Sequence, residues 1–188
     1  MLRSFLITLF ICSSLVACQT CSNGCTAYNI AIVSDPTQDK AVGVCSSELA
    51  NAIELPITGT SWKAYSPAAS SAKYITDCIS TNPLVYTQNS VRYITRSFNL
   101  NCAPTVAYIN CKSKGTATLF VNGVQASMPA CKAPEVNVGL IQDPSSLLLN
   151  LQEGVNVIEW RLESVGINGA TSASNPNGLL YNLRIIRI

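Results

Sequence analysis

The stretch from Lys114 to Val124, which reads K-G-T-A-T-L-F-V-N-G-V, restricts the fold more than any other part of this 188-residue chain. Every second residue from Ala117 to Val121 is aliphatic, which is typical of a β-strand with one buried face. Asn122-Gly123 follows at once, and this dipeptide readily adopts the positive φ angles of a two-residue turn. The stretch therefore predicts a β-hairpin whose return strand begins at Val124.

Further short strand patterns lie on both sides of this hairpin. In residues 155–164, Ile158, Trp160 and Leu162 share one face and charged residues share the other, which predicts that Trp160 lies in the core. Similar patterns cover 27–33, 40–45, 91–100, 105–111 and 179–188, whereas 47–55 has the composition of one or two helical turns. Many short strands separated by turns predict an all-β protein, an antiparallel β-sandwich of the jelly-roll kind.

The strand pattern in residues 91–100 contains a conflict. Ile94 and Phe98 are expected to point inward, yet Arg92 and Arg96 lie on the same face of the strand. An ionised side chain is costly to bury without a partner. A β-bulge or an edge position is therefore predicted, so that both arginines stay in water.

The first residues have the composition of a secretory signal peptide. Arg3 precedes an apolar run from Phe5 to Ile11, and small residues follow up to Ala17. This run is too short to cross a bilayer comfortably, and no second such run occurs. We predict a signal peptide at residues 1–17, a secreted protein, and no membrane association unless Cys18 is lipidated. A short anchoring helix that is retained is the alternative.

The processing of the chain around Cys18 has three alternatives. Residues 15–18 resemble the four-residue lipobox of bacterial lipoproteins, in which the cysteine carries the lipid. An ordinary signal peptidase would instead cut after Ala17 or after Cys18. Plain secretion is favoured, because lipid-anchored bacterial domains seldom contain so many further cysteines.

Cutting after Ala17 leaves eight of the nine cysteines, an even number that suits four disulfides in an oxidising compartment. Cys102 and Cys111 are predicted to be close, because the segment between them has about the right length to fold back. The candidates for disulfides are Cys18, Cys21, Cys25, Cys45, Cys78, Cys102, Cys111 and Cys131. Zinc bound by the first four is the alternative, but they lack a second close pair and the chain has no histidine. No metal and no cofactor are predicted.

The composition indicates one extracellular domain. Removing the signal peptide leaves 11 basic and 10 acidic residues, and this near-neutral balance predicts no nucleic-acid partner. The mature chain of about 170 residues suits one domain with a substantial core. We predict a cysteine-rich N-terminal arm over residues 18–57, packed on a sandwich formed by residues 58–188.

Several motifs resemble galactose-binding-domain-like jelly rolls, such as the non-catalytic sandwich domains of rhamnosidases and β-galactosidases. The segments that carry the resemblance are A-K-Y-I (72–75), V-R-Y-I-T-R-S-F-N-L (91–100), A-Y-I-N-C (107–111), T-A-T-L-F-V-N-G (116–123), L-Q-E-G-V-N-V-I-E-W (151–160) and G-L-L-Y-N-L-R-I (178–185). They match the V-N-G hairpin of that class and its L-x-x-G-x-N stretch before a long central strand. The resemblance covers about residues 58–188 and implies a non-catalytic jelly roll.

The chain departs from that class at three positions. Tyr74 stands where a tryptophan is usual, and Lys112 and Lys114 stand where acidic residues are usual. The matching motifs make turns and fill a core. They therefore bear on the fold more than on the function.

The sequence argues against catalysis. Without histidine, a Ser-His-Asp or Cys-His nucleophile is excluded. A pair of carboxylates for glycoside hydrolysis remains conceivable. However, Glu159 and Glu163 fall on the outer face of a strand beside Arg161, where a solvated charged face is the ordinary interpretation. We predict that the protein is not an enzyme.

The predicted ligand site lies in two loops. Trp62 and Tyr65 belong to a Gly-, Ser- and Pro-rich loop, and Asn168 and Asn175 belong to the loop before the last strand. An aromatic surface with amide groups nearby is suited to a neutral glycan. The alternative is that Trp62 covers the edge of the core and that the asparagines form turns.

Two classes of function follow. The first is a secreted carbohydrate-binding module whose partner is a glycan or a cell-surface polymer. The second is a structural, cell-surface or matrix protein whose sandwich mediates assembly, for which oligomerisation is expected.

Overall fold

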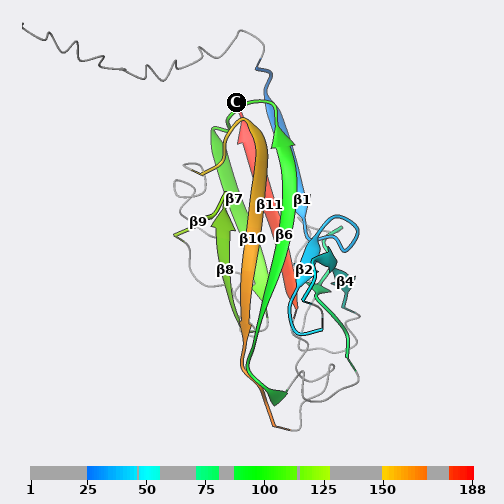
Figure 1. Cartoon of the computed structure of the whole chain (residues 1–188). Helices are drawn as coiled ribbons and strands as arrows, with labels where there is room; N and C mark the ends of the chain where they lie inside the picture. The colour runs from blue at the N-terminus through cyan, green and yellow to red at the C-terminus, as the bar shows by residue number, and fades with distance from the viewer. Residues whose placement is uncertain are drawn as a thin grey trace, which may run out of the picture.

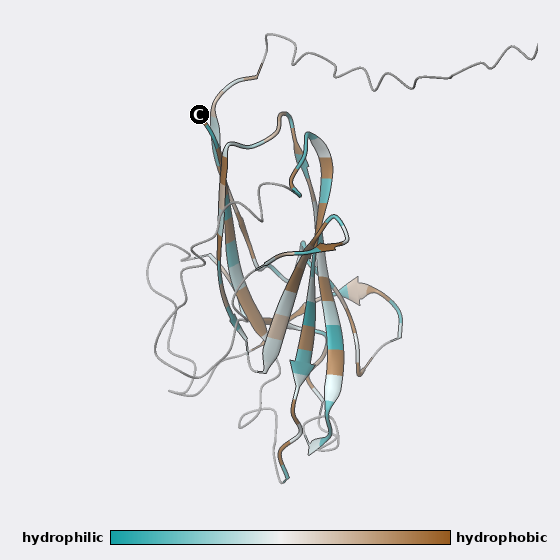
Figure 2. Ribbon diagram, turned by 90° about the vertical axis from the view of Figure 1, so that its left-hand side faces the viewer, coloured by the Kyte–Doolittle hydropathy of each residue, from teal (hydrophilic) through white to brown (hydrophobic). Residues whose placement is uncertain are grey.

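The computed structural model describes residues 25–45, 47–55, 71–80, 87–113, 115–127, 150–168 and 178–188. The β-strands within these ranges form two antiparallel sheets that pack face to face (Figures 1 and 2). The predicted all-β sandwich is therefore confirmed. The predicted signal peptide, Trp62, Tyr65 and Asn175 lie outside the described residues.

The back sheet is organised around its last strand, β11 (Leu179–Arg187). β1 (Tyr28–Val33) and β7 (Val106–Ser113) pair with β11, and β5 (Ile75–Thr76) meets it at Leu179. β4 (Ile53–Glu54) pairs with β5. The C-terminal strand β11 therefore lies between β1 and β7.

The front sheet, which faces the viewer in Figure 1, has the strand order β3-β2-β6-β10-β8-β9. Its centre is β6 (Ser90–Leu100) and β10 (Gly154–Ser164), which pair along their full length. The flanking strands are β2 (Lys40–Val42), β3 (Ala50–Asn51), β8 (Thr116–Val121) and β9 (Val124–Gln125). Residues 28–54, assigned from the sequence to an N-terminal arm, thus contribute four strands to the two sheets.

The core fills the space between the inner faces of the two sheets. The front sheet contributes Ile94, Leu119, Val121, Ile158, Trp160 and Leu162, and the back sheet contributes Ile75, Ile109, Leu179, Tyr181, Leu183 and Ile185. As predicted, Trp160 is fully buried, and its ring centroid lies 5.7 Å from that of Tyr181 on the opposite sheet. This aromatic contact joins the centres of the two layers.

The predicted hairpin is confirmed between β8 and β9. Asn122 and Gly123 have φ angles of 50° and 80°, as a two-residue turn with two left-handed positions requires. The side chain of Asn122 donates to Asn156 Oδ1 at 3.0 Å and accepts from the Val157 amide at 2.8 Å. The V-N-G and L-x-x-G-x-N motifs therefore meet in space, because the two asparagines fix the turn against β10.

The predicted helical turns in residues 47–55 are wrong. Ala50–Asn51 and Ile53–Glu54 are the short strands β3 and β4 instead. Ala50 pairs with Ala41, and Ala52, whose amide donates to the Asp39 carbonyl at 2.9 Å, is buried in the core. Pairing and burial outweigh the local preference for a helix.

Two disulfides connect distant parts of the described chain: Cys25–Cys102 and Cys45–Cys78. Cys111 is also disulfide-bonded, to a partner outside the described residues. The expectation that Cys102 and Cys111 are close is wrong. Cys102 precedes β7 and Cys111 lies near its far end, so the extended strand alone separates them by roughly 17 Å.

The two disulfides also bear on the alternative that the N-terminal cysteines bind zinc. Cys25 and Cys45 form separate disulfides, so the proposed four-cysteine zinc site is excluded for them. Disulfides persist in oxidising compartments, which indicates such a compartment for this chain. Among the described residues, no helix has the length and hydropathy needed to cross a bilayer.

The hairpin gives a stability test. Replacing Gly123 with Val should lower the free energy of unfolding by about 1–2 kcal/mol, because a β-branched residue resists the left-handed conformation. An added Cβ would meet no atom within 4 Å, so the cost is confined to the backbone. Urea unfolding measures it. Gly123→Asn is the matched control and should cost much less, and equal stability of wild type and Gly123→Val would contradict the tight turn.

Candidate functional site

The inner face of β6 contains two arginines, and the expectation that both stay in water is wrong for Arg92. β6 pairs regularly with β10 along its whole length, without a bulge, and with β2 on its other side. Arg92 is therefore forced inward together with Ile94, and its side chain is only 1% exposed. Arg96 faces the same way and is half-buried. The charge of Arg92 is tolerated because the carboxylate of Asp77 meets it, and the charge of Arg96 acts on the buried carboxyl group of Asp39.

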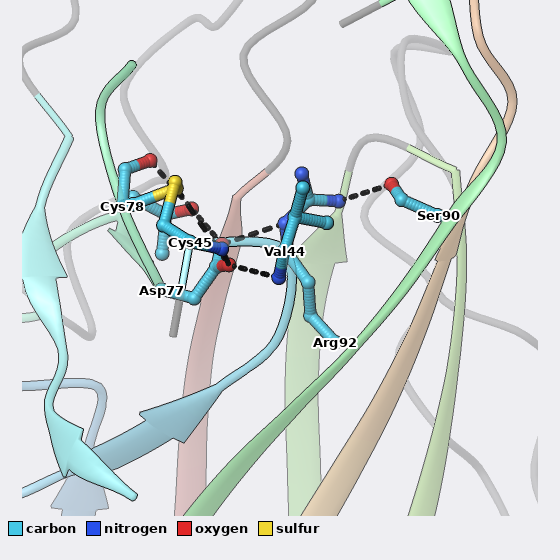
Figure 3. The surroundings of a disulfide bond; sticks show 7 residues. Val44, Cys45, Asp77, Cys78, Ser90 and Arg92 are labelled. Carbon is cyan, nitrogen blue, oxygen red and sulfur yellow. Dashed lines mark hydrogen bonds and ion pairs between the residues drawn. A yellow bond between two sulfur atoms is a disulfide. The ribbon is translucent and has the colours of Figure 1, made fainter. Parts of the chain in front are cut away.

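Arg92 forms a buried ion pair with Asp77, whose side chain is also 1% exposed (Figure 3). Arg92 Nε donates to Asp77 Oδ1 at 2.6 Å, and Arg92 Nη1 donates to Ser90 Oγ at 2.6 Å. Asp77 follows β5 of the back sheet, whereas Arg92 belongs to β6 of the front sheet. The ion pair therefore ties the two layers together.

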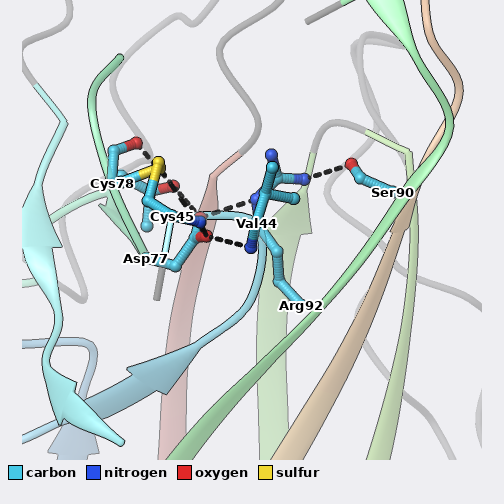
Figure 4. Close-up of polar contacts among 7 residues, drawn as sticks. Val44, Cys45, Asp77, Cys78, Ser90 and Arg92 are labelled. Atoms are coloured by element: carbon cyan, nitrogen blue, oxygen red, sulfur yellow. Dashed lines mark hydrogen bonds and ion pairs between the residues drawn. A yellow bond between two sulfur atoms is a disulfide. The ribbon is translucent and has the colours of Figure 1, made fainter. Parts of the chain in front are cut away.

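The loop after β2 completes the surroundings of Asp77 (Figure 4). Asp77 Oδ2 accepts from the amides of Val44 at 2.8 Å and Cys45 at 3.4 Å, and the Cys45–Cys78 disulfide lies beside it. A Cβ on Gly43 would come within 2.7 Å of both Asp77 and Arg92, so only glycine fits. We call this group (Gly43, Val44, Cys45, Asp77, Cys78 and Arg92) the Asp77 clamp.

The Asp77 clamp also has the composition of a metal site, but its chemistry differs. Ligand atoms of Cys45, Asp77 and Cys78 all lie within 4.8 Å of one another. The two sulfurs are joined in a disulfide, and a thiolate is the form that binds a metal. The carboxylate is already occupied by Arg92 and two amides. The geometry therefore supports a structural role for this group.

A second polar contact crosses the core between Tyr181 of β11 and Asp39, which precedes β2. The Tyr181 hydroxyl donates to Asp39 Oδ1 at 2.5 Å, and the Asp35 amide donates to Asp39 Oδ2 at 2.7 Å. Asp39 is fully buried. Burial raises the pKa of Asp39 to about 6, although these hydrogen bonds and the charge of Arg96 act in the opposite direction.

The outer side of the front sheet presents two aromatic residues to solvent. Tyr93 on β6 is 36% exposed, and Phe120 on β8 is partly exposed. Tyr93 pairs with Arg161 of β10, and Phe120 pairs with Glu159 of the same strand. The two rings therefore lie diagonally on either side of β10, with the Arg161 and Glu159 side chains between them.

We call this surface the front face; it comprises Lys40, Val91, Tyr93, Thr95, Ser97, Asn99, Thr116, Thr118, Phe120, Val155, Val157, Glu159, Arg161 and Glu163. Two of these residues are basic and two are acidic, and Arg161 forms an ion pair with Glu163. Val91, Val155 and Val157 are exposed on it as well. The front face is thus electrically balanced and exposes several apolar side chains among its polar ones.

Of the four predicted ligand residues, the structure places only Asn168, and their role in binding stays a prediction. Trp62, Tyr65 and Asn175 lie outside the described residues, and Asn168 is exposed beyond the end of β10. Sequence reasoning missed Tyr93 and Phe120. The signal was available, because the alternation that places Ile94, Leu119 and Val121 in the core leaves these two aromatic residues on the opposite face.

Comparison with known proteins finds one weak structural similarity. No family model matches this sequence, and no curated protein matches it. Among solved structures, the chain has a weak similarity to a GH31 α-xylosidase from Xanthomonas citri, with a TM-score of 0.30 and 11% sequence identity. The match covers 86% of this chain and 18% of the xylosidase chain, and a similarity this low carries no argument about function.

The buried ion pair gives a stability test. Replacing Arg92 with Met should lower the free energy of unfolding by about 3–5 kcal/mol, because Asp77 is left buried and without its partner charge. Chemical denaturation measures the loss. Arg161→Met is the matched control: its ion pair with Glu163 is solvent-exposed and should cost less than about 1 kcal/mol. Similar losses in the two variants would contradict the assigned role of Arg92.

The raised pKa of Asp39 predicts a pH-dependent stability. Between the ordinary value of 3.8 and about 6 the folded protein holds a proton that the unfolded chain releases. The contribution of this residue is therefore fully present below pH 3.8 and is lost as the pH rises through 6. Relative to Asp39→Asn, the wild type should lose about 2 kcal/mol between pH 4 and pH 7, since each pKa unit corresponds to about 1.4 kcal/mol and the unfolded chain is already partly ionised at pH 4.

Unfolding both proteins in urea across this pH range measures the difference. The amide introduced by Asp39→Asn does not titrate, so effects of the other carboxyl groups cancel. Its oxygen can accept from the Asp35 amide, and its NH2 group can donate to the Tyr181 hydroxyl oxygen. A constant difference between the two proteins from pH 4 to pH 7 would show that Asp39 is not the titrating group.

Proposed function

We propose that this protein is a secreted, non-catalytic carbohydrate-binding module of the galactose-binding-domain-like jelly-roll class, and that it binds a neutral glycan on the front face. The observation that carries this proposal is the diagonal placement of Tyr93 and Phe120 around β10. Aromatic rings present a flat apolar surface to the CH face of a sugar. The side chains between them offer hydrogen-bond donors and acceptors for hydroxyl groups.

The charges on the front face support a neutral ligand. Lys40 and Arg161 are balanced by Glu159 and Glu163, and Arg161 already has Glu163 as its ion-pair partner. An acidic polysaccharide would meet two carboxylates with no excess of positive charge. The binding energy would therefore come from stacking and from hydrogen bonds to hydroxyls.

The spacing of the carboxylates on this face supports binding without hydrolysis. Glu159 and Glu163 are four residues apart on β10, which places their backbones about 13 Å apart. Glycoside hydrolases hold their two carboxyl groups roughly 5–9.5 Å apart around the scissile bond. The front face thus offers a surface for a sugar chain but not this arrangement for cleaving it.

The loop residues remain part of the proposal. Trp62, Tyr65, Asn168 and Asn175 are proposed as a second contact region for the same ligand. Secretion after removal of residues 1–17 is proposed as well, and the disulfides support it, since they require an oxidising compartment.

A second candidate function is assembly with copies of the chain or with other matrix components. Val91, Val155 and Val157 favour it, because they are exposed on the front face, with Val155 being 66% exposed. An interface between proteins would bury such residues. Analytical ultracentrifugation separates the candidates: a glycan-binding module stays monomeric at micromolar concentration, whereas an assembly subunit associates.

A glycan array probed with the oxidised protein tests the proposed function. We expect binding to neutral glycans, and Tyr93→Ala should weaken it at least tenfold, since stacking of a sugar on an aromatic ring is lost. Tyr108→Ala is the matched control, because Tyr108 lies on the outer side of the back sheet and is also partly accessible to solvent. No binding to any glycan, or equal weakening by both variants, would contradict the proposal. Loss with Trp62→Ala but not with Tyr93→Ala would move the site to the loops.

A further inference from the structure

We infer that the front face binds an internal segment of an extended polysaccharide rather than a chain end or a single sugar. This inference rests on the proposed function. It concerns which part of the glycan is recognised, and it is argued from the positions of Tyr93 and Phe120 and from the exposure of the residues around them.

The distance between the two aromatic residues excludes a single sugar as the ligand for both. Tyr93 and Phe120 stand on strands that are two positions apart in the sheet, and they are offset by two residues along the strand direction. From the usual strand spacing and rise, their backbones are about 12 Å apart. A six-membered ring built of single bonds about 1.5 Å long is much smaller than that. Simultaneous stacking on both residues therefore requires at least two sugars with a spacer between them.

Side chains suited to the intervening sugar lie between the two rings. Glu159 and Arg161 project from β10 on this face. Glu159 lies between Thr95 and Phe120 in one row of paired residues across the strands, and Arg161 lies between Tyr93 and Thr118 in another. Carboxylate, guanidinium and hydroxyl groups supply both donors and acceptors. Along the diagonal, a sugar chain would thus meet an aromatic ring, then polar side chains, then a second aromatic ring. Three or more consecutive sugars can make these contacts.

The outer surface of the front sheet continues past both aromatic residues onto β9 and β2. In the row of Phe120, Gln125 of β9 follows and is exposed. In the row of Tyr93, Val42 of β2 follows and is partly exposed. A site for a chain end needs a wall that stops the ligand, whereas Gln125 is exposed and Val42 is partly exposed beside the two rings. The described surface therefore continues past both aromatic residues.

Affinity electrophoresis followed by a length series tests this inference. The full mature protein is first run in gels that contain soluble neutral polysaccharides: a β-glucan, a galactan, a mannan and a xylan. Fragments of one to six sugars from the polysaccharide that retards the protein are then titrated by calorimetry. We expect no measurable binding of the monosaccharide, at least a tenfold gain in affinity between two and four sugars, and little change beyond. Reducing the end sugar to its alditol should leave the affinity of the hexasaccharide unchanged.

Two variants relate this result to the two aromatic residues. Tyr93→Ala and Phe120→Ala should each remove the gain between two and four sugars, whereas Tyr108→Ala should keep it. If a polysaccharide binds but the monosaccharide binds equally well, or if modifying the end sugar abolishes binding, the inference is overturned and the carbohydrate-binding function stands. If no polysaccharide retards the protein, the proposed function fails and the inference fails with it.

Discussion

The buried ion pair between Asp77 and Arg92 is the interaction on which the rest of the described structure depends. It places two opposite charges between two sheets, where each is acceptable only because the other is present. Arg92 is thereby fixed at one position of β6. Because side chains alternate along a strand, fixing Arg92 on the inner side also fixes the direction in which its neighbour Tyr93 projects on the outer side. The contact that holds the sandwich together therefore also sets the surface proposed to bind the ligand.

Covalent bonds and hydrogen bonds reinforce this connection between the layers. The Cys45–Cys78 disulfide lies beside Asp77, and Cys25–Cys102 joins the segment before β1 to the connection between β6 and β7. The Tyr28 hydroxyl adds a hydrogen bond to the Cys102 carbonyl at 2.7 Å. Such cross-links restrict the unfolded chain and stabilise a fold whose strand pairings are mostly long-range. They also suit a preformed binding surface, because binding a ligand then requires little reordering.

The sequence was informative where a pattern is local. The hairpin at Asn122-Gly123 and the buried side of β10 with Trp160 follow from alternation and from turn chemistry, and both are confirmed. The burial of Arg92 was not predictable in this way, because its partner Asp77 comes from the other sheet. Cys102 pairs with Cys25, which is 77 residues away in the sequence, so no local pattern indicates that bond. The candidate site was missed for a different reason. A Gly- and Ser-rich loop with Trp62 and Tyr65 is a recognisable pattern for a sugar-binding surface, whereas Tyr93 and Phe120 lie on strands whose opposite faces form the core.

Amide chemical shifts of the isotopically labelled protein during titration with a neutral oligosaccharide that binds it test the account most directly. The account predicts that the largest changes fall on residues 93–95 of β6, 118–120 of β8 and 159–161 of β10, while the inner residues of the Asp77 clamp change little. Changes confined to residues 165–168 beyond β10, or to the outer side of β7 and β11, would contradict it.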